Sequence, residues 1–181
     1  MKELISKNSS GKIVLIFVII TAIVYLIMPI VTMPKVMQFA NEMKILDLLP
    51  GGYNLEYVNT LFKILGEEGR YNYLYFQIPV DTIFPVLLTI TNCLLIALLL
   101  KKLELFRNPF IYLCFFPLIS GIADYAENIG IIRMLIKYPD ITIFAVKVNS
   151  LFGIIKYTSI TISFVAIIFL GVFWGIKRKR I

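Results

Sequence analysis

The stretch IVLIFVIITAIVYLIMPIV, residues 13–31, decides the fold. It contains no charged residue, and it is close to the roughly 20 apolar residues that a helix needs to cross a bilayer. It is also longer than the apolar region of a secretory signal peptide, and no A-x-A cleavage site follows it. We therefore expect a retained membrane-spanning helix.

Three further stretches have the same character: residues 78–100, 109–136 and 149–174. Hydrophobic residues make up 59% of the 181 residues and charged residues 16%, with a mean hydropathy of +0.86. A soluble domain is about 45–50% apolar and about 25% charged. Pro109 suits the first turn of the third helix, and Pro139 helps to end it. We therefore predict an all-α integral membrane four-helix bundle, with residues 1–181 as a single membrane domain.

Basic residues orient this bundle, because four spans place three basic segments on one side. These segments are the N-terminal tail with Lys2, Lys7 and Lys12, the connection with Lys101, Lys102 and Arg107, and the tail KRKR at 177–180. The positive-inside rule predicts that this side, with both termini, is cytoplasmic. The abundance of Ile, Lys and Asn is typical of an AT-rich bacterial genome, so we expect a bacterial cytoplasmic membrane. KRKR is interpreted as a topology anchor, and no nucleic acid partner is expected.

The connection 32–77 then lies outside, with a net charge of −1. Its charged residues are Lys35, Lys44, Lys63 and Arg70 against Glu42, Asp47, Glu56, Glu67 and Glu68. A turn at LLPGGY, 48–53, precedes Asn54, which can cap a short amphipathic helix over about 54–66. Gly66 suits the end of that helix. One face of this helix is apolar, and it is formed by Leu55, Val58, Leu61, Phe62 and Leu65. Tyr71, Tyr73 and Tyr75 resemble an interfacial aromatic belt.

The stretch GIADYAENIG, 121–130, interrupts the third span with polar side chains. At 100° per residue, Ser120, Asp124, Glu127 and Asn128 share one arc of the helix. Other spans carry polar residues on one side each: Asp81 and Asn92 on the second, and Lys156 and Ser159 on the fourth. The four charged residues all fall in the outer third of the bilayer. Pro85 also removes the helical hydrogen bond to the carbonyl of Asp81, which frees that acceptor.

A charge inside a membrane costs from about 2.5 kcal/mol upward, so these side chains are expected to face the bundle interior. Lys156 is the basic residue at matching depth, against the acids Asp81, Asp124 and Glu127. Three possibilities for neutralising the surplus stay open: a protonated carboxyl group, Arg70 reaching down from the outer connection, or a bound cation. Alternatively, the whole cluster only fixes helix packing.

Several classes of chemistry are not expected. The chain has no histidine and no CxxC pair, so neither a zinc site nor thiol–disulfide redox chemistry is predicted. Cys93 and Cys114 lie in apolar stretches, where free cysteine acts as a small hydrophobic residue. We expect no metal and no cofactor.

Four short motifs carry a resemblance: GY at 52–53, LGEEGRYNYL at 65–74, DTIFP at 81–85 and ADYAEN at 123–128. Together they resemble an uncharacterised family of small bacterial four-span integral membrane proteins, over most of the chain from about residue 45 to Lys156. The resemblance implies the four-span topology and marks these residues. It implies no reaction.

Three functions stay open. The first is a membrane-embedded site that binds or processes an amphiphile such as a lipid or isoprenoid, with Asp124 or Glu127 as acid or base and Lys156 as counter-charge. The candidate ligand-binding residues are Asp81, Asn128, Arg70, Asn92, Ser120 and Ser159. The second is a structural or assembly protein. The third, proton- or cation-coupled transport, is disfavoured because the cytoplasmic halves of the third and fourth spans offer no polar relay. A homo-oligomer also stays open.

Overall fold

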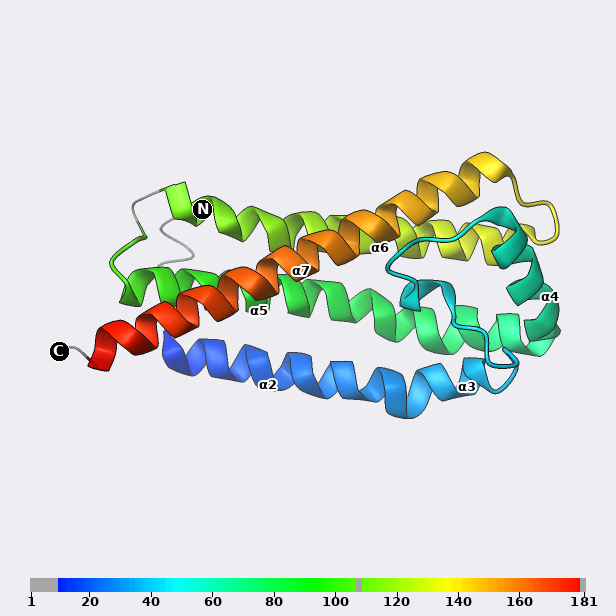
Figure 1. Ribbon diagram of the computed structural model, residues 1–181. Helices are drawn as coiled ribbons and strands as arrows, with labels where there is room; N and C mark the ends of the chain where they lie inside the picture. Colours follow the sequence, from blue (N-terminus) through cyan, green and yellow to red (C-terminus); the bar gives the residue numbers. More distant parts are fainter. Residues whose placement is uncertain (1–9, 107–108, 180–181) are drawn as a thin grey trace.

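The computed structural model describes residues 10–106 and 109–179, and Figure 1 shows them as a set of long helices lying side by side. The first unit is α2 (Gly11–Ile27), which continues through the π-helical η1 (Met28–Thr32) into α3 (Met33–Met37). The other three are α5 (Ile78–Lys102), α6 (Phe115–Lys137) and α7 (Ile143–Lys179). The described residues contain no strand, so the predicted all-α fold is confirmed.

Four helical units are long and apolar enough to cross a membrane. They are longer than predicted: the first extends from Gly11 to Met37 and the fourth from Ile143 to Lys179. The sequence criterion ends a span where polar residues begin, whereas the helix continues past that point. Before α6, the 3-10 helix η4 (Pro109–Cys114) places Pro109 in a helical turn, as expected.

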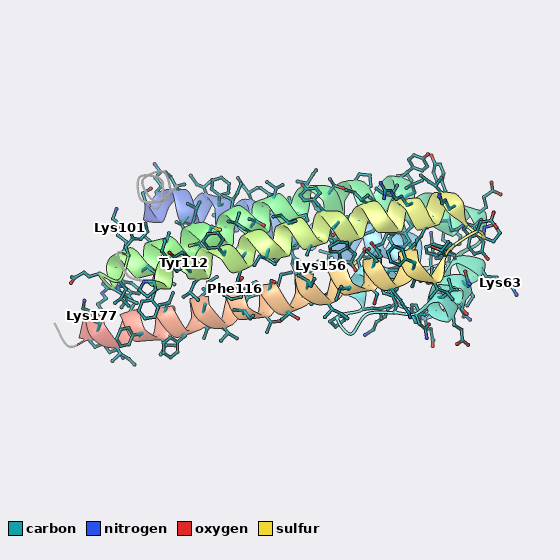
Figure 2. The ribbon with its side chains drawn as sticks, turned by 90° about the horizontal axis from the view of Figure 1, so that it is seen from above. Lys63, Lys101, Tyr112, Phe116, Lys156 and Lys177 are labelled. Carbon is teal, nitrogen blue, oxygen red and sulfur yellow. The ribbon has the colours of Figure 1, made fainter. Side chains whose placement is uncertain are left out.

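The chain reverses direction at each connection. Figure 1 shows that α2 begins, α5 passes to α6, and α7 ends at one end of the bundle, whereas α4 covers the other end. Figure 2 accordingly shows Lys101 and Lys177 at one end and Lys63 at the other. α6 and α7 pack closely together, and α2 packs along α5 without an extensive contact with α7.

The predicted amphipathic helix is present as the first part of α4 (Leu55–Asn72), which joins two helical segments across Gly66. Asn54 caps it, because Asn54 Oδ1 accepts a hydrogen bond from the Tyr57 amide at 2.8 Å. Gly66 interrupts the helix at the predicted position, because its φ of 62° and ψ of −168° are not helical. The second segment begins directly after it and continues through η3 (Tyr73–Gln77) into α5.

The apolar face of α4 packs into a core at this end of the bundle. Its buried members from α4 are Val58, Leu61, Phe62 and Leu65. Of the three tyrosines predicted to form an interfacial belt, Tyr71 and Tyr75 are exposed and their rings lie 4.6 Å apart. Tyr73 is not part of a belt, because it is fully buried and its hydroxyl accepts the Leu46 amide at 3.1 Å.

Gly66 provides the first prediction. Its φ and ψ angles lie in a region that is essentially restricted to glycine and costs other residues about 1–3 kcal/mol. Gly66→Ala should therefore lower the unfolding free energy by about that amount, measured by denaturant unfolding in detergent micelles. Gly171→Ala is the control, because Gly171 is helical with open space around it, and alanine there should be neutral or slightly stabilising. Equal effects at both positions would contradict the assigned role of Gly66.

Candidate functional site

Polar side chains predicted to face inward are buried between α5, α6 and α7. Each member of the set is at most 6% exposed: Asp81, Asn92, Ser120, Asp124, Glu127, Asn128, Lys156 and Ser159. The set includes the four charged residues predicted at matching depth. Helical phase and depth therefore correctly predicted that these side chains, from three helices, lie in one buried region. Figure 2 shows Lys156 partway along the length of α7, away from the labelled lysines at the two ends of the bundle.

Lys156 forms the centre of an ion cluster. Its Nζ lies 2.5 Å from Glu127 Oε2 and 3.4 Å from Asp124 Oδ1. The contact with Glu127 is a short ion pair that does not meet the geometry of a hydrogen bond. Gly153, one turn before Lys156, makes room for this pair, because a Cβ there would collide with the Glu127 carboxylate. The helix-packing glycine and the buried ion pair therefore depend on each other.

Pro85 and Asn128 form a second connection between α5 and α6. Pro85 has no amide hydrogen to donate to the Asp81 carbonyl one turn earlier. Asn128 Nδ2 donates to that carbonyl instead, at 3.2 Å. The acceptor that the sequence predicted to be free is thus taken by an interhelical hydrogen bond.

Asp47 is a buried acid that the sequence reasoning missed. It was counted among the charges of the outer connection, but it lies in the 3-10 helix η2 (Leu46–Leu48) and is 4% exposed. Two tyrosines hold this turn in place. The Tyr73 hydroxyl accepts the Leu46 amide, and the Tyr157 hydroxyl donates to the Asp47 carbonyl at 2.5 Å. The apolar context ILDLL, 45–49, was the available signal, because solvent-exposed loops rarely surround an acid with four large apolar residues.

Neither carboxylate oxygen of Asp47 accepts a well-formed hydrogen bond within the described residues, although the Tyr73 hydroxyl is a neighbouring donor. Burial, and next the nearby charge of Asp81, raise the pKa of Asp47 well above its usual value. The folded state therefore binds this proton more tightly than the unfolded state. On this account the docked turn is most stable below about pH 4 and loses stability as the pH rises through the raised pKa.

A cavity of about 790 Å³ connects these acids to an apolar interior. Asp47, Asp81, Asp124 and Lys156 line one part of it. The remaining lining residues are mostly apolar: Val18, Thr21, Ala22, Tyr25, Met28, Pro29, Met33, Pro34, Met37, Leu48, Phe84, Leu88, Thr91, Asn92, Leu95, Tyr157, Ile160 and Phe164. Along α5 the lining extends from Asp81 to Leu95, which is about 21 Å at 1.5 Å per residue.

Residues of both α2 and α7 line the cavity, and these two helices share no extensive contact. Some of the lining residues are themselves exposed: Ala22, Tyr25 and Pro29 on the first unit and Phe164 on α7. Thr21 Oγ1 and Thr91 Oγ1, 2.7 Å apart, connect α2 to α5.

Other predicted site residues lie away from the cavity lining. Arg70 does not reach the acids: its Nη1 donates to the Phe62 carbonyl at 2.8 Å, and its guanidinium lies 4.7 Å from the Tyr138 ring centroid. Ser120 Oγ donates to the Pro117 carbonyl at 2.9 Å. Ser159 and Glu127 are buried behind the lining. No group of three or more Cys, Asp or Glu suited to a metal ion occurs in the part of the chain described.

Comparisons with protein-family models, with curated proteins and with solved structures gave no match for this chain. The cavity and its side chains are therefore the basis for a functional assignment.

The ion cluster leads to a second prediction. Lys156→Met leaves Glu127 buried without its counter-charge, and breaking a buried ion pair costs about 3–5 kcal/mol. We expect a loss of this size in unfolding free energy, measured in detergent micelles. The double variant Lys156→Met with Glu127→Gln should recover much of the loss. Strictly additive effects of the two changes would show that the pair is not coupled.

The proline–asparagine pair leads to a third prediction. Asn128→Leu should cost about 1 kcal/mol, because it leaves the Asp81 carbonyl without a donor. Pro85→Ala supplies a helical amide to the same carbonyl, so the cost of Asn128→Leu should fall in a Pro85→Ala background. The measurement is a double-mutant cycle of unfolding free energies. A cost that is unchanged by Pro85→Ala would refute this assignment of the hydrogen bond.

Proposed function

We propose that this protein is a multi-pass membrane protein that binds an amphiphile, with the apolar part in the cavity and the polar head at Asp47, Asp81, Asp124 and Lys156. One observation carries the proposal: a single cavity joins an apolar passage to a buried group of charged side chains. Ligand sites are typically apolar, with a few convergent polar groups that fix orientation.

The dimensions of the cavity support a lipid-like ligand. Its extent of about 21 Å along α5 exceeds the roughly 15 Å that each leaflet contributes to the hydrocarbon core. An extended alkyl or isoprenoid tail therefore fits between the helices. The exposed lining residues on α2 and α7, and the lack of extensive contact between these helices, support entry from the bilayer between them, so that the tail does not cross water.

The cavity-lining acids and the acids behind them receive different roles. Asp124 lines the cavity and also lies 3.4 Å from Lys156, so it is our candidate for an acid or base if the ligand is processed. Glu127 is fully buried outside the lining, and we assign it as the counter-charge that keeps Lys156 in place. Asn128 acts through Asp81, whose carbonyl it binds.

We also propose a bacterial cytoplasmic membrane as the location, with the α2 start and the α7 end on the cytoplasmic side. The basic segments at this end support that orientation through the positive-inside rule. The short motifs that resemble small bacterial four-span proteins agree with it. The charged part of the cavity then lies in the outer half of the bilayer, on the side covered by α4.

A structural role is the second candidate, favoured by the interhelical contacts of Asn128 and Glu127. These two residues join α6 to α5 and to α7 without lining the cavity. These contacts support a packing role for part of the polar cluster. That role leaves no task for Asp47, whose carboxylate is buried against the cavity without a cationic partner among the described residues.

The fourth prediction tests the binding proposal. Ala22→Trp places a large side chain in the cavity wall, whereas Ile23→Trp, at the adjacent and 54% exposed position, places the same side chain outside the lining. Native mass spectrometry in mild detergent should show a co-purified amphiphile at one per protein in the wild type and in Ile23→Trp. Ala22→Trp should weaken binding of this amphiphile about tenfold, or by about 1.4 kcal/mol. The fraction of protein that carries the adduct should fall accordingly.

Wild-type protein that carries no adduct, under conditions that retain annular lipid, would argue against the binding function. Equal occupancy in Ala22→Trp and Ile23→Trp would place any adduct on the outer surface of the bundle instead of in the cavity.

A further inference from the structure

The charges around the cavity are unequal. Four carboxyl groups (Asp47, Asp81, Asp124 and Glu127) surround one ammonium group, that of Lys156. Lys156 is within ion-pair distance of Asp124 and Glu127 only, among the described residues. Arg70, the other cation considered, is engaged by Phe62 and Tyr138. Asp47 and Asp81 therefore form an acidic pair without a cationic partner in the described part of the fold.

When both carboxyl groups are ionised, the unmet atoms of this pair are all acceptors. Asp47 Oδ1, Asp47 Oδ2 and Asp81 Oδ2 are buried and accept no well-formed hydrogen bond from a described residue, although the Tyr73 hydroxyl is a neighbouring donor to Asp47. Buried polar atoms without a partner are uncommon in folded proteins, and each one calls for an explanation such as an absent ligand. Both residues line the cavity, so a ligand in the cavity can reach these oxygens.

We propose that the head group bound here is a primary ammonium, held by Asp47 from the outer connection and Asp81 from α5; this rests on the proposed function of the cavity as an amphiphile site. A primary ammonium has three N–H donors and no acceptor, which complements the three unmet oxygens. Its positive charge also offsets the surplus of acid in a water-poor region, where an unpaired charge is costly.

Other head groups fit less well. A phosphate or carboxylate would meet the acidic pair with like charge. A hydroxyl group has one hydrogen to donate and leaves two oxygens unmet. A quaternary ammonium has no N–H to donate and is usually bound by an aromatic cage. A metal ion would need a group of three ligands in suitable geometry, which does not occur among the described residues.

Asp47 belongs to the connection between the first two spans, and contacts with the bundle hold it at the cavity. Tyr157 on α7 and Tyr73 in η3 hold the turn that carries it. Tyr53 and Ser150 attach the following residues to α7, through the Tyr53 amide at 2.9 Å from Ser150 Oγ. The turn can therefore place a carboxylate over the charged part of the cavity in the folded protein.

The test uses three single-chain probes with the same tail: dodecylamine, 1-dodecanol and dodecyltrimethylammonium. Binding to the full-length protein in detergent micelles is measured as thermal stabilisation at several probe concentrations. Dodecylamine should bind the wild type at least about tenfold more tightly than either of the other two probes. Asp47→Asn should remove that preference while keeping a side chain of the same shape.

Asp140→Asn is the matched control, because Asp140 is an exposed acid in the connection between α6 and α7. It should leave dodecylamine affinity within about twofold of the wild type, since screened surface charges contribute little. Asp81→Asn is a second variant of the acidic pair, used in case Asp47→Asn does not fold. If either folded variant of the acidic pair binds dodecylamine as the wild type does, the assignment of its acid is overturned.

The probes also separate this inference from the proposed function. If 1-dodecanol binds as tightly as dodecylamine, and Ala22→Trp blocks both, then the cavity binds amphiphiles but the ammonium assignment is wrong. If no probe binds, the cavity proposal fails as well. Nanodiscs of phosphatidylethanolamine against phosphatidylcholine identify the source of the ammonium. Stabilisation in the former indicates a lipid head group, and stabilisation by dodecylamine alone indicates a free single-chain amine.

Discussion

The arrangement of α5, α6 and α7 depends on keeping the charge of Lys156 away from lipid. An isolated ammonium in the hydrocarbon region is costly, and Lys156 is only 5% exposed. It is tolerated because Glu127 and Asp124 approach it from α6. This requirement fixes the rotation of α6 against α7 and demands the missing side chain at Gly153. Helices that are apolar on most of their surface have few other ways to select one register.

The parts of the structure that follow from helical geometry could be predicted from the sequence. A 3.6-residue period determines which face a residue occupies, and the rise per residue determines its depth, so the sequence alone places Asp124, Glu127 and Lys156 together. The same reasoning found the role of Pro85, because a missing amide has a definite location on a helix. The buried face of α4 followed for the same reason.

The connection between the first two spans could not be predicted in this way. No periodic pattern locates a turn of three residues, and the hydrophobic context of Asp47 does not indicate what it faces. Its position depends on contacts with Tyr73 and Tyr157, which are far apart in the sequence. Gly66 shows a related limit: a glycine after an apolar face indicated where the first helical segment stops, but not that a second one begins directly after it. Arg70 reaching the acids was one of three open possibilities, and a carbonyl and a ring in its own neighbourhood hold it instead.

The polar cluster contains two sets of residues with different energetic consequences. The first set is joined by interhelical contacts, through the ion pairs of Lys156 with Glu127 and Asp124 and the hydrogen bond from Asn128 to the Asp81 carbonyl. The second set is the carboxylates of Asp47 and Asp81, which line the cavity and have no ion-pair partner among the described residues. If packing were the only requirement, asparagine or leucine at position 47 would fold with less penalty, since burial opposes the charged form of Asp47. The contacts of Lys156, Glu127 and Asn128 are therefore sufficient to explain the helix register. The proposed ammonium ligand explains the carboxylates of Asp47 and Asp81.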